Sequence, residues 1–288
     1  MSMQRYPVHG AGLGLKRDLM VPLLDQPPEQ SDSKIDFFEV APENWIAMGG
    51  VWGKRLRQFT ERHPFVCHGL SLSIGGPSPL DEKFLLKVKG FLKEHDIKLY
   101  SEHLSYCSDD GHLYDLMPIP FTEEAVKYVA KRIRQTQEIL EQKMAIENVS
   151  YYAAPGKEME EIDFLNAVLE EADCLLHFDV NNTYVNSVNH KYDPKEYIRA
   201  LPSERMSYLH VAGHYNEAED LLIDTHGAAI IDPVWELLEY TYQQHGVIPT
   251  LLERDFNIPP LEELLAEVNT ITRIQHKCEG HKDDIAVA

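Results

Sequence analysis

Short apolar segments alternate with longer amphipathic segments along the whole chain, and this alternation limits the folds that are available. The short segments are rich in β-branched and aromatic residues, as buried parallel strands are. The eight predicted strands cover residues 8–15, 35–40, 65–74, 97–103, 144–147, 174–179, 206–211 and 248–253. Eight strands that alternate with helices are the count of a (β/α)8 barrel. We therefore predict an α/β fold, with residues 1–275 forming a single-domain TIM barrel.

Helix-start signals fall between the predicted strands. Thr122 can cap a helix that runs to about residue 142, because its hydroxyl can accept a hydrogen bond from the first turn. Asp193 and Asp232 each stand before a proline, which predicts a capping carboxylate followed by the first helical residue. Apolar residues spaced by three and four predict further helices over 80–94 and 261–274. Residues 276–288 are polar, and we expect them to form a disordered tail.

A doubly wound open sheet is the structural alternative for such an alternation. Its dinucleotide-binding forms carry glycines in a GxGxxG pattern after the first strand. Here Gly10, Gly12 and Gly14 stand in the segment HGAGLGL, which has a different spacing. We interpret these glycines as a sign of close packing at the mouth of a barrel.

The charge balance narrows the classes of partner. The 47 acidic residues minus the 27 Lys and Arg residues give a formal net charge of −20. Because nucleic-acid binding depends on Lys and Arg, we expect no nucleic-acid partner. The first residues lack the apolar core of a signal peptide, no window reaches a transmembrane length, and the four cysteines form no CxxC pair. We therefore expect a cytoplasmic protein with reduced thiols and no membrane partner.

Six successive predicted strands each end with a side chain that can bind a metal ion. These residues are His68, His103, Glu147, Asp179, His210 and Glu253. The carboxyl ends of barrel strands lie at one face, where active sites are built. A single residue of this kind is more often a structural side chain, but six in succession indicate a common role. A buried carboxylate or imidazole needs a partner, and a metal ion supplies one.

The densest group of such residues follows the seventh predicted strand. Asp224 and His226 alternate, so both can face one way if the segment is extended. With the six strand-end residues they make eight candidate ligands, whereas one ion with open positions needs about three protein ligands. We therefore predict two or three ions, with a carboxylate such as Glu147 bridging two of them. Since no cysteine belongs to the set, the expected ions are iron, zinc or manganese.

Three residues are candidates for catalysis. His214 is a ligand, a base or a loop histidine, and the sequence leaves these roles open. Arg254 and Asp255 suit a clamp for a substrate carboxylate, and a structural ion pair is the alternative for them. His177 shares the face of Asp179 but is expected to lie deeper, in the core or against a ligand.

Two further groups are candidates for supporting roles. Asn181 and Asn182 directly follow Asp179, and one of them can complete a third metal site. The cluster after the second predicted strand contains carboxylates and an amide that can bind substrate or orient ligands. Its members are Glu39, Glu43 and Asn44.

Eight segments together resemble a known family. They are FFEVAPENW, HGLSLSIGG, SEHLSY, IENVS, HFDVNN, LHVAGH, DTHG and LLERD. The set resembles the multinuclear non-haem iron-dependent oxidative enzymes, a formerly uncharacterised family that includes the methanobactin-biosynthesis oxidase. The resemblance covers about residues 6–275 and implies a TIM barrel related to xylose isomerase and to the metal-dependent apurinic endonucleases.

The resemblance also implies a function in natural-product biosynthesis. It implies two or three iron ions, mixed Fe2+ and Fe3+, at the barrel mouth. The implied reaction is a peptide modification: cysteine residues of a ribosomally made precursor peptide are oxidised with O2 to oxazolone-type or thiooxazole-type products. A separate partner protein helps to recognise the peptide.

The family pattern distributes the ligands over three sites. It implies that His68, His103 and Glu147 surround one iron. It implies that Glu147 bridges to a second iron, held by Asp179, His210 and Glu253. Asp224 and His226, with Asn182, would hold a third. The endonuclease relatives have a histidine at the position of Asn182, so this chain departs from their pattern there.

Three other functions fit part of the pattern. A zinc-dependent phosphodiesterase of the endonuclease-IV type would use the same ligands to activate water and hold phosphate. The net charge of −20 counts against a DNA substrate. A sugar isomerase would need a lysine and more carboxylates in its site. A metal-binding protein without turnover would have a filled coordination sphere and no open position.

Overall fold

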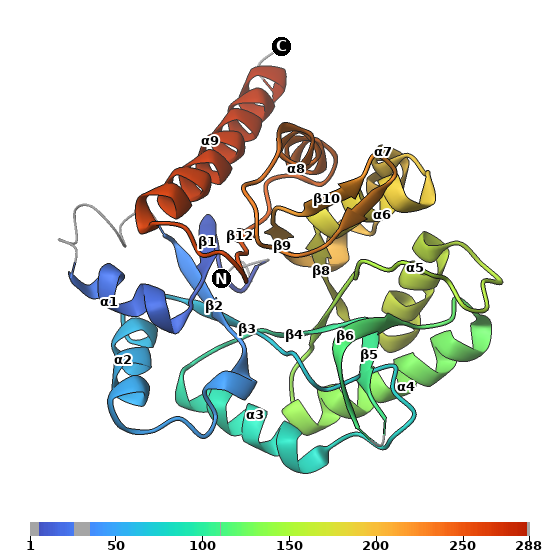
Figure 1. Ribbon diagram of the computed structural model, residues 1–288, viewed down its shortest axis with the longest axis horizontal. Coiled ribbons are helices and arrows are strands. Elements are labelled where there is room, and N and C mark those ends of the chain that lie inside the picture. The colour runs from blue at the N-terminus through green and yellow to red at the C-terminus, as the bar shows by residue number, and fades with distance from the viewer. Residues whose placement is uncertain (1–5, 26–34, 110, 287–288) are drawn as a thin grey trace. The chain divides into compact units, whose positions relative to one another are not determined.

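Eight parallel strands form a closed barrel in the computed structural model, which describes residues 6–25, 35–109 and 111–286. The strand order is β1-β12-β9-β8-β7-β4-β3-β2. The strands are β1 (Ala11–Gly14), β2 (Phe37–Val40), β3 (Phe65–His68), β4 (Tyr100–His103), β7 (Ala145–Glu147), β8 (Leu175–Asp179), β9 (Met206–Val211) and β12 (Thr250–Leu252) (Figure 1). Each lies within one of the eight predicted segments, so the predicted TIM barrel is confirmed.

Two compact units can be distinguished in the chain. The first covers Met1–Glu39, Asp179–Arg199 and Tyr208–Ala288, and the second covers Val40–Phe178 and Ala200–Ser207. The first unit contains β1, β12 and most of β2 and β9, and the second contains β3, β4, β7 and most of β8. Each unit therefore carries four neighbouring strands of the barrel order.

The helices of the second unit are α2 (Gly50–Thr60), α3 (Glu82–Glu94), α4 (Glu123–Leu140) and α5 (Glu161–Ala172). Helix α4 packs against both α3 and α5 (Figure 1). Its start is the predicted one, since the Thr122 side chain accepts a hydrogen bond from the Ala125 amide at 3.1 Å. Val126, Val129 and Ile133 are buried, which is the three-and-four spacing of a helix with one apolar face.

The helices of the first unit are α1 (Arg17–Asp25), α6 (Val180–His190), α7 (Pro194–Arg199), α8 (Asp232–His245) and α9 (Leu261–Ala286). Helix α8 packs against α6, α7 and α9. The Asp193 carboxylate accepts from the Lys195 amide at 2.8 Å, as a cap should. The predicted cap at Asp232 is wrong, because Asp232 is the first residue of α8 and Ile231 stands at the cap without a side-chain hydrogen bond.

Helix α9 differs most from its prediction. It continues to Ala286, through most of the stretch that we expect to be a disordered tail. Cys278 is buried, and Lys277 Nζ lies 2.6 Å from Glu239 Oε1 of α8, so this stretch packs against a neighbouring helix. A polar sequence allows this because a surface helix needs only one apolar face. None of the helices described, α9 included, is long and apolar enough to cross a membrane.

Two hairpins are additions to the barrel that the sequence did not predict. In the second unit, β5 (Ser105–Ser108) and β6 (His112–Pro118) form one directly after β4. In the first unit, β10 (Tyr215–Ala218) and β11 (Leu221–Ile223) form the other shortly after β9. Each hairpin follows a strand that ends in a candidate ligand, so both belong to the loops at the carboxyl ends of the strands.

The four cysteines lie inside the protein. Cys67, Cys107, Cys174 and Cys278 are all buried and none of them forms a disulfide. Burial raises the pKa of the Cys174 thiol to about 12. Burial, followed by the charge of Glu102, also raises the pKa of Cys107. The scattered spacing of the cysteines in the sequence indicated this reduced state.

The close packing predicted for the early glycines can be tested at Gly12. It pairs with Phe37 of β2, and a Cβ atom there would lie 2.6 Å from the Phe37 ring. We expect Gly12→Ala to lower the free energy of unfolding by about 1–3 kcal/mol, because the buried ring cannot yield without strain. Gly90→Ala is the matched control: Gly90 is exposed in α3 with open space around it, so the change should stabilise by up to about 1 kcal/mol. Urea titrations with equal midpoints for the two variants would contradict the prediction.

Candidate metal centre

Three of the predicted ligands meet in the second unit. His68 ends β3, His103 ends β4 and Glu147 ends β7, and the register pairs His103 with Glu147. The two imidazole Nε2 atoms are 3.1 Å apart. Glu147 Oε2 lies 3.1 Å from Nε2 of His68 and 3.3 Å from Nε2 of His103. The three donor atoms therefore form a nearly equilateral triangle.

The size of this triangle fits a metal ion. Ligands at about 2.0–2.2 Å from one ion lie about 3.0 Å apart at adjacent octahedral positions and about 3.4 Å apart in a tetrahedron. The three observed separations, 3.1, 3.1 and 3.3 Å, fall between these values. Two imidazoles and a carboxylate are also a donor set that iron, zinc and manganese accept. The residues present therefore fit the predicted metal.

Neighbouring side chains orient the two imidazoles. Ser101 Oγ donates to the Cys67 carbonyl at 3.3 Å and lies 2.8 Å from His68 Nδ1. When the hydroxyl donates to the Cys67 carbonyl, its oxygen accepts from Nδ1 of His68, and this tautomer leaves the lone pair of Nε2 for a metal. The sequence did not single out Ser101, and its position two residues before His103, on the same face of β4, is the signal that could have found it.

Glu102 is a second supporting residue that the sequence did not assign. It is buried, and its Oε1 accepts from the Tyr100 hydroxyl at 2.8 Å and from the Leu72 amide at 3.0 Å. Its Oε2 lies 3.8 Å from His103 Nδ1. Burial alone would raise the pKa of Glu102, but the hydrogen bonds and the charge of His103 lower it below its ordinary value. A buried negative charge therefore stands behind the His103 ligand.

His177 lies beside this cluster, as predicted for a residue deeper than Asp179. It is fully buried, and its ring meets the His68 ring edge-on, with centroids 4.8 Å apart. A ring nitrogen of His177 also lies within 4.8 Å of a Glu147 carboxylate oxygen. The contact suits a role in packing against the ligands.

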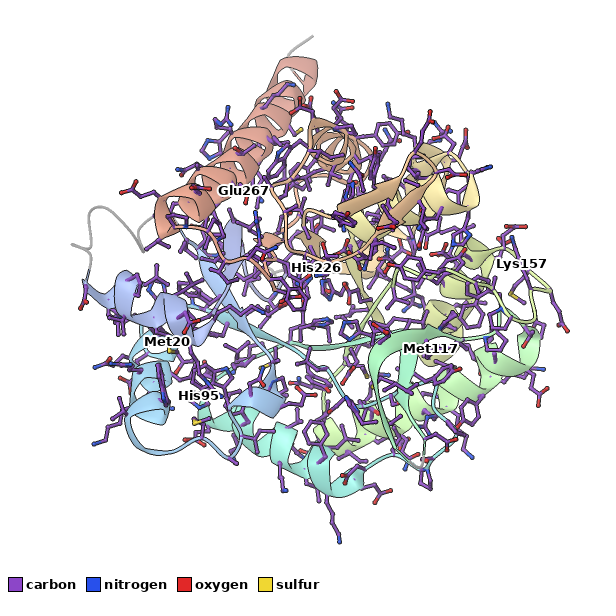
Figure 2. All side chains as sticks on the ribbon, viewed as in Figure 1. Met20, His95, Met117, Lys157, His226 and Glu267 are labelled. Carbon is purple, nitrogen blue, oxygen red and sulfur yellow. The ribbon has the colours of Figure 1, made fainter. Side chains whose placement is uncertain are left out.

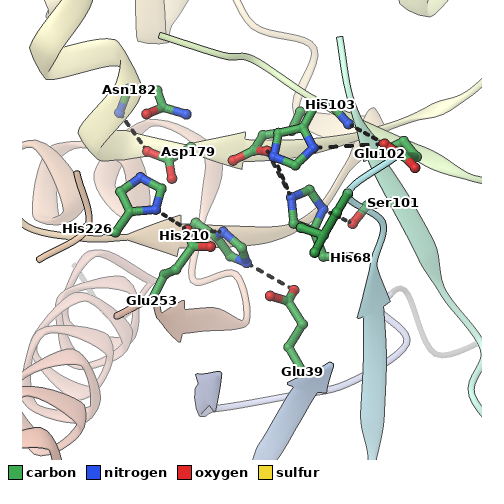
Figure 3. Close-up of polar contacts among 12 residues, drawn as sticks. Glu39, His68, Ser101, Glu102, His103, Asp179, Asn182, His210, His226 and Glu253 are labelled. Carbon is green, nitrogen blue, oxygen red and sulfur yellow. Dashed lines mark hydrogen bonds and ion pairs between the residues drawn. The ribbon is translucent and has the colours of Figure 1, made fainter. Parts of the chain in front are cut away.

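A second group of predicted ligands meets in the first unit. Asp179, His210 and Glu253 each offer a donor atom, and these atoms lie within 4.8 Å of one another (Figure 3). Asp179 also caps α6, since its Oδ1 accepts from the Asn182 amide at 2.6 Å. The cap fixes the carboxylate, because the hydrogen bond to the helix N-terminus holds one of its two oxygens. This hydrogen bond places the Asn182 backbone next to the Asp179 carboxylate, and the Asn182 side chain is buried.

His210 lies between two carboxylates. Its Nδ1 is 2.9 Å from Glu253 Oε2 and its Nε2 is 3.0 Å from Glu39 Oε2. Glu39 is further fixed by the Tyr208 hydroxyl, which donates to the same oxygen at 2.7 Å. Burial alone would lower the pKa of His210, but the charges of Glu39 and Glu253 raise it well above its ordinary value. Glu39 is therefore placed to orient a ligand, one of the two roles expected for it.

Asp224 and His226 also meet, at the edge of the same group. His226 Nε2 lies 2.7 Å from Asp224 Oδ1, and its Nδ1 lies 3.1 Å from Asp255 Oδ2 and 3.2 Å from Glu253 Oε2. The backbone of His226 is left-handed, with φ at 49°. Such a conformation is costly for a residue with a side chain and persists where the surroundings require it. Here it directs the imidazole among three carboxylates.

The first unit gathers more negative than positive charge around these histidines. Its five carboxylates are Glu39, Asp179, Asp224, Glu253 and Asp255. Lys16 is a cationic neighbour, and it pairs with Asp255, the most exposed of the five. Burial alone would lower the pKa of His226, but the charges of Asp224 and Glu253 raise it well above its ordinary value. Carboxylates in such numbers favour a bound cation.

His214 lies at the end of a hydrogen-bonded chain. Asn181 Nδ2 donates to Asp224 Oδ1 at 2.9 Å, so Asn181 Oδ1 is the acceptor for His214 Nδ1 at 2.8 Å. The proton of the neutral imidazole is therefore on Nδ1, and Nε2 carries a lone pair. Burial lowers the pKa of His214, and the charge of Asp224 opposes this shift without reversing it. His214 Nε2 is buried and has no hydrogen-bond partner among the described residues.

The remaining candidates serve structural contacts. Arg254 Nη2 lies 2.8 Å from Glu267 Oε2 of α9, which is the structural ion pair that the sequence left open beside a substrate clamp (Figure 2 marks Glu267). Glu43 Oε1 accepts from the amides of Leu70 and Ser71 at 2.8 and 3.1 Å and so holds the loop after β3. Asn44 is exposed.

The fold has close counterparts among known structures. The IOLI protein with a bound zinc atom superposes with a TM-score of 0.58 at 14% identity, over 94% of this chain and 96% of that chain. A xylose isomerase-like TIM barrel protein from Mycobacterium smegmatis in complex with magnesium gives 0.58 at 10% identity, over 95% of this chain and 97% of that chain. At such identities the likeness shows the fold alone.

Several relatives share much higher sequence identity with this chain. The UPF0276 protein Nmul_A2550 of Nitrosospira multiformis is 64% identical over 275 residues, which are 95% of this chain and 96% of that protein. The UPF0276 protein PA3283 of Pseudomonas aeruginosa is 56% identical over 275 residues, which are 96% of this chain and 95% of that protein.

A family model supplies the functional context. The family described as "RiPP precursor modification enzyme MbnB/TglH/ChrH" matches residues 10–276, nearly the whole chain. This match confirms the resemblance seen in the eight sequence segments. The chain therefore belongs to the MbnB/TglH/ChrH family of enzymes that modify ribosomally made precursor peptides.

Proposed function

We propose that this protein is a multinuclear non-haem iron oxidase that uses O2 to modify cysteine residues of a ribosomally made precursor peptide. The products would be of the oxazolone or thiooxazole type. The observation that carries the proposal is the triangle of His68, His103 and Glu147, whose donor atoms are spaced as ligands of one ion. Membership of a family that modifies precursor peptides supports the substrate class.

The residues divide into ligand sets within each unit. His68, His103 and Glu147 would hold one iron in the second unit. Asp179, His210 and Glu253 would hold another in the first unit, with Asp224, His226 and Asn182 as candidates for a third. The bridging role of Glu147 stays a prediction from the family resemblance. Iron, when bound, would supply redox chemistry with O2 and lower the pKa of a coordinated thiol.

Among the three catalytic candidates, His214 is the one we propose for proton transfer. Its Nε2 carries the lone pair because Asn181 fixes the proton on Nδ1. Burial lowers the pKa of His214, which keeps the imidazole neutral near pH 7 and able to accept a proton. We propose that Nε2 takes the proton of the substrate thiol.

Asp255 and Arg254 are proposed as positioning residues. Asp255 pairs with His226 Nδ1 at 3.1 Å and is itself held by Lys16, so it fixes the imidazole ring. Arg254 follows Glu253 directly and is tied to Glu267 of α9, so its ion pair anchors the end of β12. Neither role requires contact with the substrate.

A zinc-dependent hydrolase of the endonuclease-IV type is the second candidate. The same nitrogen and oxygen donors suit zinc, and the structurally similar IOLI protein holds a zinc atom. Manganese is a further alternative for the same set.

We place the recognition of the precursor peptide partly on a separate partner protein, which the family resemblance implies.

Metal analysis of the purified protein tests the ligand assignment. We expect about two to three irons per chain, because each set supplies about three protein ligands. His68→Ala should lose about one iron per chain, since it removes one corner of the donor triangle. His276→Ala is the matched control, because His276 is exposed on α9 and belongs to no ligand set. Zinc in place of iron after growth in iron-rich medium would favour the hydrolase instead.

Glu39 should influence the second ligand set without being a ligand. Glu39→Gln removes the charge behind His210 and should weaken metal binding by about 10–100-fold. Tyr208→Phe removes a single hydrogen bond to the same Glu39 oxygen and should have a smaller effect. Competition with a coloured chelator gives both affinities. If Glu39→Gln and Tyr208→Phe weaken binding equally, the charge of Glu39 has no special role.

Oxygen consumption tests the reaction itself. The substrate would be a cysteine-containing peptide encoded beside the coding sequence of this chain, mixed with anaerobic iron-loaded protein and then given O2. We expect O2 uptake together with a peptide mass loss of four hydrogen atoms, because a four-electron oxidation removes them. The same peptide with serine in place of cysteine should give neither signal. Absence of O2 uptake with the cysteine peptide overturns the oxidase proposal.

A further inference from the structure

The hairpin β10–β11 connects His214, the proposed base, with Asp224, a candidate metal ligand. His214 directly precedes β10, and Asp224 directly follows β11. Tyr215 and Ile223 are paired at the base of the hairpin, next to these two residues. A ligand that lies along the hairpin therefore has one end next to His214 and Asp224.

The two edges of this hairpin differ. The outer edge of β11 is closed by α6, because the Asn189 side chain donates to the Leu222 carbonyl at 3.0 Å and accepts from the Leu222 amide at 2.8 Å. All four residues of β10, Tyr215 to Ala218, are exposed. In the described part of the chain, no hydrogen bond joins the outer edge of β10 to another segment. An open edge of this kind can pair with an extended peptide.

The hairpin and the sequence on both sides of it carry charged residues of one sign. Residues 206–253 contain no Lys or Arg. They contain eight acidic residues: Glu217, Glu219, Asp220, Asp224, Asp232, Glu236, Glu239 and Glu253. Three of these, Glu217, Glu219 and Asp220, belong to the hairpin and are exposed. Such a surface attracts a basic segment and repels an acidic one. A second copy of this chain, with a net charge of −20, is therefore a poor occupant.

An independent feature at the base of the hairpin also indicates a ligand. His214 is only 6% exposed, yet its Nε2 atom has no hydrogen-bond partner among the described residues. A buried acceptor without a partner is costly unless a bound group completes it. The unused acceptor lies one residue before the open strand.

We propose that β10 binds an extended, basic stretch of the substrate peptide as an added β-strand, which leads the adjoining residues to His214 and Asp224. The identity of the occupant as the precursor peptide rests on the proposed function. Backbone hydrogen bonds along β10 would hold many sequences in one register, and the acidic hairpin would select for Lys and Arg. The peptide would thus be positioned by its main chain and chosen by its charge.

Hydrogen exchange of the full-length protein, with its metal content as purified, tests the docking mode. The probe is a fluorescein-labelled (Lys-Thr)6 peptide, and the reference probes are (Glu-Thr)6 and a Lys-Thr peptide that is N-methylated at every residue, so that neither strand edge can donate. We expect (Lys-Thr)6 to slow amide exchange in residues 215–218 by at least about tenfold, because added backbone hydrogen bonds protect amides. Neither reference probe should do so. Equal protection by the N-methylated peptide overturns strand addition.

Charge-reversal variants test the selectivity, with binding of the fluorescein-labelled (Lys-Thr)6 peptide followed by fluorescence anisotropy. Glu217→Lys/Glu219→Lys should weaken (Lys-Thr)6 binding by at least about tenfold in low salt, and by less in high salt. Glu138→Lys/Glu279→Lys makes the same change in net charge on exposed positions of α4 and α9, outside residues 206–253, and should stay within about twofold of the parent. Equal weakening by both variants overturns the role of the hairpin. Because the assay needs neither O2 nor turnover, docking can fail while oxidation holds, or the reverse.

Discussion

Excess negative charge at the ends of the barrel strands is the constraint on which the rest of the structure depends. Glu147 is 1% exposed and faces two imidazoles, and Asp179 is fully buried at the start of α6. A carboxylate in such a place destabilises the fold unless a positive charge or several hydrogen bonds compensate it. The histidines can meet this need as cations, and a metal ion can meet it better by replacing their protons. Metal binding at these strand ends would therefore be linked to folding.

Strand register is what turns scattered residues into ligand sets. Parallel pairing places Glu147 next to His103 in the second unit, and it places His210 next to Leu251, two residues before Glu253, in the first. Supporting residues then fix the rings, with Ser101 behind His68 and Glu39 behind His210. Since such partners orient a ligand and set its tautomer, they matter almost as much as the ligands themselves.

The sequence predicted an element most accurately where one hydrophobic pattern extends over the whole segment. Strand β9 lies where it was predicted, residue for residue, because it is mostly apolar and is buried throughout. Strand β10 was missed because its four residues are exposed and show no alternation. Helix α6 was missed as well, since its asparagines are poor helix formers and its start depends on the Asp179 cap.

The candidate site could likewise be predicted only in part. The candidate ligands at the strand ends could be predicted, because a parallel barrel brings the carboxyl ends of its strands together regardless of the loop conformations. The partner of a ligand was not readable, since it depends on which strands are neighbours and on side-chain conformation. Arg254 illustrates this: the sequence allowed a substrate clamp or an ion pair, and it gave no sign that Glu267 of α9 would lie 2.8 Å from Arg254 Nη2.

The buried cysteines acquire a further meaning beside the proposed chemistry. A catalyst that attacks thiols in its substrate endangers its own, and thiolates are the vulnerable form. Cys67 precedes a proposed iron ligand directly, yet it is fully buried in β3, and Cys174 has a pKa of about 12. Under the proposed chemistry, burial in the barrel would shield these sulfur atoms from oxidation.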